Sequence, residues 1–202
     1  MDPCLFLKKN LICFVYVDDI ILAGPDGDEL EKEIINLGVE KEEYQHKFEL
    51  RNEGEVGDFL GIRIKNTGEK QFQFSQSGLI DKVIKETEME DSNSVLSPTA
   101  TGALGKDEGG DPFDEKWDYP SVIGMLLYLS GNSRPDTAFA VNQCARFTHA
   151  PKKSHATAVK RIIRYLKGST DQGLILKPKC NYKIDCYVDT DYAGLWSTCE
   201  DK

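Results

Sequence analysis

Residues 14–24 read FVYVDDIILAG, two runs of β-branched and aromatic residues on either side of two adjacent aspartates. Such runs favour β-strands, and the short polar interruption between them predicts a tight turn. We therefore expect a buried hairpin formed by residues 11–17 and 20–24. Asp18 and Asp19 would occupy its tip.

Asp18 and Asp19 are an unusual pair for an otherwise apolar hairpin. Adjacent carboxylates repel each other, and their burial is costly unless cations compensate the charge. A pair of Mg²⁺ ions is one such compensation, because Mg²⁺ prefers oxygen ligands and polymerases use two of these ions to activate a 3′ hydroxyl. The alternative is a solvated turn, since aspartate is common in turns of every function. Spacing alone leaves both interpretations open.

Helices and short strands are expected after the hairpin. Apolar spacing predicts a helix over residues 28–44, and the acidic Asp28 and Glu29 in its first turn favour the positive end of the helix dipole. The next expected elements are strands at 48–50, 59–64 and 72–74, a turn at 66–70 and a helix at 77–86.

Residues 92–115 differ from the rest in composition. They are rich in Gly, Ser, Thr, Asp and Pro and have almost no apolar periodicity, which predicts a linker and an internal boundary. Beyond it we expect helices at 119–130, 135–147 and 154–167, then strands at 173–176 and 183–188. This order of elements predicts a mixed α+β layer fold.

The overall composition narrows the class of protein. The 202 residues are 40% hydrophobic and 29% charged, as in an ordinary globular protein. No apolar run approaches the roughly 20 residues of a membrane span, and a basic signal-peptide start is absent, so an intracellular protein is expected. Six scattered cysteines predict reduced thiols, and the net charge of −9 argues mildly against a nucleic-acid partner.

Five ordered blocks of the sequence are similar to one known family. The blocks are DPCLF at 2–6, FVYVDDIILAG at 14–24, DFLGIRI at 58–64, YPSVIGMLLYL at 119–129 with RPD at 134–136, and residues 155–168 ending in YLKG. In this order they resemble the polyprotein of copia-type LTR retrotransposons, from reverse transcriptase to the start of RNase H. The resemblance covers almost the whole chain and implies an RNA-directed DNA polymerase in the intact parent protein.

The resemblance also assigns roles to residues of the first half. Asp18 and Asp19 match the metal-binding carboxylates of the polymerase palm, which implies Mg²⁺ as cofactor, and Tyr16 matches the aromatic position beside the primer end. The residues that resemble the primer-grip hairpin are Phe59, Leu60 and Gly61. There Gly61 would let backbone approach the primer phosphates, whereas a plain core strand is the alternative.

Basic and acidic residues of the second half receive roles in the same way. Lys160, Arg164 and Lys167 share one face of the expected helix and could contact phosphates of a template-primer duplex, although a solvated helix face is the alternative. The stretch CYVDTDYAG at 186–194 resembles the first strand of a copia-type RNase H domain. That similarity makes Asp189 a catalytic metal ligand, with Asp191 as the alternative. Without it, both are turn residues at a strand end.

The resemblance implies a division of the chain and a set of partners. Residues 1–91 would be the C-terminal part of the palm and the start of the thumb, 92–115 the linker, 116–170 the helical thumb and connection, and 171–202 the start of RNase H. The implied partners are an RNA or DNA template-primer and dNTPs, with no membrane, in a cytoplasmic virus-like particle or the nucleus.

The family's third catalytic aspartate lies upstream and has no counterpart here, so we expect the isolated chain to be inactive. The other hypothesis is a truncated, non-catalytic transposon remnant that binds nucleic acid or protein. Intact Asp18 and Asp19 favour a parent that is still catalytic or has decayed only recently.

Overall fold

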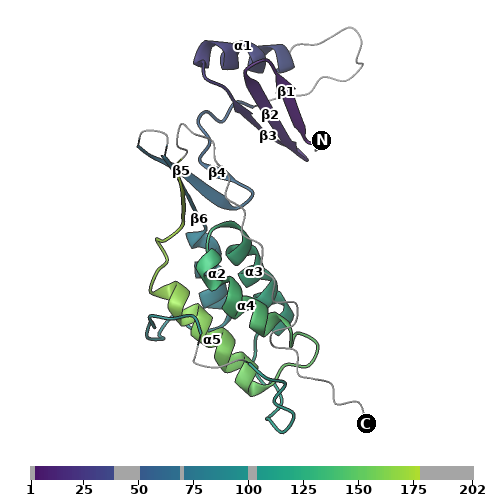
Figure 1. Cartoon of the computed structure of the whole chain (residues 1–202), viewed down its shortest axis with the longest axis vertical. Helices are drawn as coiled ribbons and strands as arrows, with labels where there is room; N and C mark the ends of the chain where they lie inside the picture. Colours follow the sequence, from purple (N-terminus) through teal and green to yellow (C-terminus); the bar gives the residue numbers. More distant parts are fainter. Residues whose placement is uncertain (1–2, 39–50, 69–70, 100–103, 178–202) are drawn as a thin grey trace, which may run out of the picture. The chain divides into compact units, whose positions relative to one another are not determined.

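The computed structural model describes residues 3–38, 51–68, 71–99 and 104–177 (Figure 1). The chain divides into two compact units, Met1–Val56 and Gly57–Lys202. Helices and antiparallel sheets occur together, which confirms the α+β class. The linker predicted at 92–115 lies within the second unit, and the strands predicted at 48–50 and 183–188 lie outside the described residues.

The first unit is a three-stranded antiparallel sheet with one helix. Its strands are β1 (Leu5–Lys8), β2 (Leu11–Tyr16) and β3 (Asp19–Ala23), in the order β1-β2-β3, and its helix is α1 (Gly27–Gly38). The predicted hairpin is therefore present, but its turn lies one residue earlier, at Val17 and Asp18, because Asp19 pairs with Tyr16. Its strands are mostly half-buried or exposed and not buried as expected. The helix predicted over 28–44 is present as far as Gly38, where the described residues stop.

Helix α1 covers one face of this sheet. An added Cβ at Gly24 would lie 2.4 Å from Leu11 Cδ2, so the glycine makes room for the Leu11 side chain, with Leu30 of α1 beside it. Lys8 Nζ donates to Glu33 of the helix at 2.7 Å and ties β1 to α1. Among the described residues of this unit, Leu11 is the one apolar side chain that is fully buried.

The sheet of the second unit joins segments that are far apart in the sequence. It is antiparallel in the order β4 (Asp58–Phe59), β5 (Ile62–Gly68), β6 (Gln71–Ser75) and β7 (Leu174–Leu176). The single strand predicted over 59–64 is wrong, because Leu60 and Gly61 turn the chain back. Their φ angles of 51° and 70° lie in the left-handed region, which a continuous strand does not contain.

Helices build the rest of the second unit. They are α2 (Ser77–Glu86), α3 (Tyr119–Asn132), α4 (Ala138–Ala145) and α5 (Lys153–Lys167), with a short 3₁₀ turn η1 (Pro135–Thr137) before α4. The helix predicted over 135–147 is thus a 3₁₀ turn followed by a shorter α-helix. Helix α3 begins where sequence favours it, because Asp118 caps the Ser121 N–H at 3.0 Å and Pro120 follows the cap.

The four helices enclose the hydrophobic core of the second unit. Its most enclosed members come from all of them and include Ile80, Val83, Val122, Leu126, Leu129, Val141, Val159, Ile162, Ile163 and Leu166. Burial of so many aliphatic side chains supplies the main driving force for folding of this unit. Within the described ranges, no helix combines the length and the apolar character that a bilayer crossing requires.

Candidate functional site

The tip of the β2–β3 hairpin brings the two predicted catalytic acids together. Tyr16 and Asp19 are the last paired residues, so Val17 and Asp18 form a two-residue turn. Val17 has a φ of 55° and its side chain is 87% exposed. A β-branched residue with positive φ is strained by an amount of the order of 1–3 kcal/mol, and such strain is concentrated at functional turns.

Asp18 and Asp19 are both exposed at this tip. Within the described part of the chain, neither carboxylate accepts a hydrogen bond or forms an ion pair, so their oxygens are open to solvent. Open carboxylate oxygens are the donors that suit Mg²⁺. The described residues contain no group of three or more His, Cys, Asp or Glu side chains arranged for a metal. The tip therefore offers two acidic ligands and needs others to complete a metal site.

The register of the hairpin also places the Tyr16 side chain. Directly opposed residues of an antiparallel pair project to the same face, so Tyr16 and Asp19 are neighbours on one face. Side chains alternate between the two faces along β2, and Leu11 and Tyr16 are separated by an odd number of positions. Leu11 therefore projects to the other face, toward α1. Tyr16 consequently lies on the face that α1 does not cover, beside one of the two acids.

The second predicted element, at Phe59 to Gly61, is the turn between β4 and β5. An added Cβ at Gly61 would meet nothing within 4 Å, so the positive φ, not crowding within the chain, favours glycine there. The Tyr128 hydroxyl of α3 donates to the Leu60 carbonyl at 2.6 Å and holds the turn against the helix. Sequence reasoning missed Tyr128, because a contact across 68 residues leaves no local pattern.

Each of the three basic residues predicted to contact template-primer phosphates has a partner within the chain. Lys160 pairs with Glu115 at 2.6 Å, and Arg164 Nε donates to the Asn93 carbonyl at 2.6 Å. Lys167 Nζ donates to the carbonyls of Glu90 and Ser92. These three side chains fasten the segment between α2 and α3 onto helix α5. Contact with phosphates stays a prediction, and it would compete with these bonds.

A buried polar network occupies the RPD block that the sequence singled out. Arg134 is fully buried and binds Asp136 through two hydrogen bonds, at 3.0 and 2.8 Å. It also donates to the Ser169 carbonyl at 2.9 Å, and the Tyr165 hydroxyl donates to Asp136 at 2.8 Å. The network joins η1 to the end of α5. Its role is therefore structural.

Two of these groups have shifted pKa values. Burial alone raises the pKa of Asp136, but the hydrogen bonds from Arg134 and Tyr165 outweigh it and hold that pKa below its ordinary value. The hydrogen bond to Asp136 raises the pKa of Tyr165. At neutral pH the network therefore contains an ionised Asp136 and a neutral Tyr165.

Asp189, the predicted RNase H ligand, lies outside the described residues.

Comparison with known proteins shows what the segment with the acid-bearing hairpin is similar to. Residues 4–101 match the family described as reverse transcriptase (RNA-dependent DNA polymerase). This match confirms the resemblance carried by the FVYVDDIILAG block. No solved structure matches the chain.

The particular relatives are the Pol polyproteins of copia-type transposons. The chain is 32% identical, over 96% of its length, to the retrovirus-related Pol polyprotein from transposon RE1 of Arabidopsis thaliana, and 30% identical to that from transposon RE2. It spans 13% of the length of each. It is also 29% identical to an uncharacterized mitochondrial protein of the same plant, of which it covers 72%.

Proposed function

We propose that this chain supplies the part of a copia-type reverse transcriptase that carries two catalytic carboxylates, Asp18 and Asp19. The observation that carries the proposal is the exposed hairpin tip, which presents Asp18 in the turn and Asp19 at the start of β3, within the segment matching the family. Residues 1–91 then act as palm and start of the thumb, 116–170 as thumb and connection, and 171–202 as the start of RNase H. Asp189 serves the last of these as a metal ligand.

The chemistry follows from the donors at the hairpin tip. Asp18 and Asp19 would hold Mg²⁺, which, when bound, activates the primer 3′ hydroxyl and stabilises the leaving pyrophosphate. Tyr16 offers an aromatic ring on the same face as Asp19, where it can contact the primer end. The strained turn holds the carboxylates in one place before substrate arrives, which lowers the cost of organising the site.

The turn at Leu60 and Gly61 supports the same function. Phosphates approach closely only where backbone is uncovered, and Gly61 has no side chain and open space around it. The Tyr128 hydroxyl fixes the carbonyl of the neighbouring Leu60. In the proposal, this turn contacts the primer backbone of an RNA or DNA template-primer, and dNTPs are the second substrate.

A chimaeric polymerase tests the proposal. Residues 4–101 replace the matching residues of the Pol polyprotein from transposon RE1, and primer extension on an RNA template is measured with Mg²⁺. We expect extension, and we expect Asp18→Asn or Asp19→Asn to lower its rate at least about 100-fold, because metal-ligand carboxylates support several kcal/mol of transition-state stabilisation. The isolated chain should give no extension.

The matched control is Asp26→Asn, an acid of the same unit just beyond the hairpin. Asp26 accepts the Asp28 N–H at 2.9 Å, a bond that asparagine retains, so this variant should extend primers like the unaltered chimaera. Equal rates for Asp18→Asn and Asp26→Asn would contradict the proposal. A folded chimaera without activity would also count against it.

A further inference from the structure

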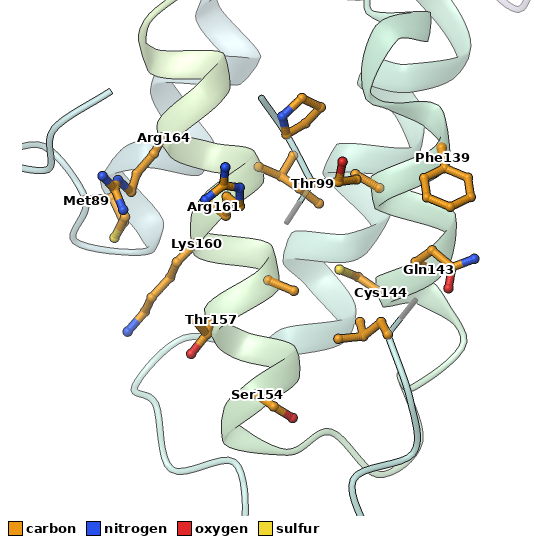
Figure 2. Close-up of a pocket in the computed structure, with 15 residues that line it drawn as sticks. Met89, Thr99, Phe139, Gln143, Cys144, Ser154, Thr157, Lys160, Arg161 and Arg164 are labelled. Carbon is orange, nitrogen blue, oxygen red and sulfur yellow. The ribbon is translucent and has the colours of Figure 1, made fainter. Parts of the chain in front are cut away.

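A cavity of about 550 Å³ lies between helices α4 and α5 of the second unit. Figure 2 shows Lys160, Arg161 and Arg164 of α5 on one side of it and Phe139, Gln143 and Cys144 along α4 on the other. Its volume falls within the range of small-molecule sites, roughly 300–1,000 Å³. The proposed polymerase chemistry uses none of its lining residues as a catalytic group.

The walls of this cavity are mainly apolar. They include Met89 and Leu104 from the segment between α2 and α3, Ala158 and Ile162 from α5, and Phe139, whose side chain is 60% exposed. Burial raises the pKa of the Cys144 thiol to about 12, so this cysteine is a neutral wall and not a nucleophile. The walls suit an apolar body.

The charge of the lining is one-sided. Among the described residues that line the cavity, three are basic and none is acidic, in a chain whose net charge is −9. Two of the three have partners, since Lys160 pairs with Glu115 and Arg164 donates to the Asn93 carbonyl. The positive charge of Arg164 is not neutralised by this partner, because the Asn93 carbonyl carries no net charge. The cavity is therefore a locally positive site.

Arg161 is the third basic side chain, and it has no partner within the described part of the chain. Its Nε is fully enclosed and makes no hydrogen bond. Because this Nε is closed to solvent, an anion can reach the guanidinium only through its two terminal nitrogens. Pairing there would supply the counter-charge that the described residues do not give Arg161. The guanidinium fork suits a carboxylate or a phosphate, which it can bind through two parallel hydrogen bonds.

We propose that this cavity binds a small amphipathic anion, a molecule with an apolar body and one carboxylate or phosphate group. The apolar body contacts Phe139, Leu104 and Ala158, and the anionic group pairs with Arg161. Lys160 and Arg164 line this cavity and are also predicted template-primer contacts. The anion is assigned to Arg161, which the proposed polymerase function does not use, so either proposal can fail without the other.

Calorimetric titration of the full chain with three matched probes tests the proposal. The probes are decanoate, decyl phosphate and decanol, which share an apolar chain and differ in the head group. We expect saturable binding of at least one anion, tighter than that of decanol by about tenfold or more, the value of one charge-assisted hydrogen bond. The stronger of the two anions identifies the head group as carboxylate or phosphate.

Two variants locate the binding. Arg161→Gln removes the unpaired charge and should weaken the anion about tenfold or more while leaving decanol unchanged, without a lower melting temperature. Thr157→Trp places a bulky ring at an exposed position of the lining and should weaken all three probes. The control is Arg63→Gln, the same change on β5 of the same unit, at an exposed residue outside the cavity.

Three results would overturn the proposal. One is the absence of binding by all three probes, and another is decanol bound as tightly as both anions. The third is anion affinity unchanged in Arg161→Gln relative to Arg63→Gln.

Discussion

The two compact units differ in the size of their hydrophobic cores and in the residues with a proposed catalytic role. The second unit encloses a continuous core from four helices, whereas the described residues of the first form one helix on one face of a three-stranded sheet. On the uncovered face, Leu7 and Ile12 are 61% and 46% exposed. The acid-bearing turn thus belongs to the unit with less internal support. A small one-sided layer of this kind is marginally stable by itself.

The largest expected effect tests where the stability lies. Leu126→Ala empties a position in the core of the second unit and should lower the free energy of unfolding by about 2–5 kcal/mol. Leu11→Ala, in the first unit, should cost about 2 kcal/mol or less, because Leu11 is the one buried apolar residue among those described in that unit. Urea denaturation followed by circular dichroism measures both.

Leu127→Ala is the matched control for the core variant. It lies next to Leu126 on α3 but is partly exposed, so it should cost less than about 1 kcal/mol. A loss for Leu11→Ala as large as that for Leu126→Ala would remove the contrast between the two units.

The next effect concerns the polar network of the second unit. Asp136→Asn weakens two hydrogen bonds to the buried Arg134 and should cost about 1–3 kcal/mol at neutral pH. Because the folded pKa of Asp136 is below its ordinary value, this stability is present above the unfolded pKa of about 3.9 and is lost as the pH falls through the folded pKa.

Denaturation of wild type and Asp136→Asn between pH 7 and pH 2 measures this dependence, and the difference between them should narrow in acid. The exposed Asp114→Asn serves as control, with a constant and small difference. A gap for Asp136→Asn that widens in acid would contradict the assigned pKa direction.

A smaller effect is expected at the β4–β5 turn. Gly61→Ala forces a side chain into positive φ and should destabilise the second unit by about 1–2 kcal/mol, although the space around it is open. Gly57→Ala, also in open space but without a positive φ, should cost less. Equal denaturation midpoints for the two variants would show that the turn relaxes and does not demand glycine.

Local pattern was sufficient for the elements that carry their own signal. The β2–β3 hairpin follows from β-branched runs around two polar residues, and α2 follows from apolar spacing alone. The family was also recognisable, because five blocks in order are more specific than any one of them. The metal chemistry assigned to Asp18 and Asp19 rests on that resemblance and stays a prediction.

Long-range contacts account for what the sequence did not predict. The apolar residues around Leu60 predict a strand there. The hydrogen bond that holds the turn comes from Tyr128, 68 residues away, and leaves no local pattern. The Arg134 network depends on Ser169, 35 residues further on. The sequence pattern predicts that Lys160 faces solvent or phosphate. In the structure it forms an ion pair with Glu115, 45 residues earlier in the sequence.

Manganese-induced line broadening in amide NMR spectra of the full chain tests the central claim most directly. With Mn²⁺ in place of Mg²⁺, residues 17–20 should broaden first, because Asp18 and Asp19 present open, adjacent carboxylates. The Asp18→Asn, Asp19→Asn double variant should lose this effect. Asp26 and Asp28, acids of the same unit, are the internal comparison. Broadening that begins at those two acids or in the second unit, or that persists at residues 17–20 in the double variant, would contradict the assignment of the hairpin tip as the metal-binding element.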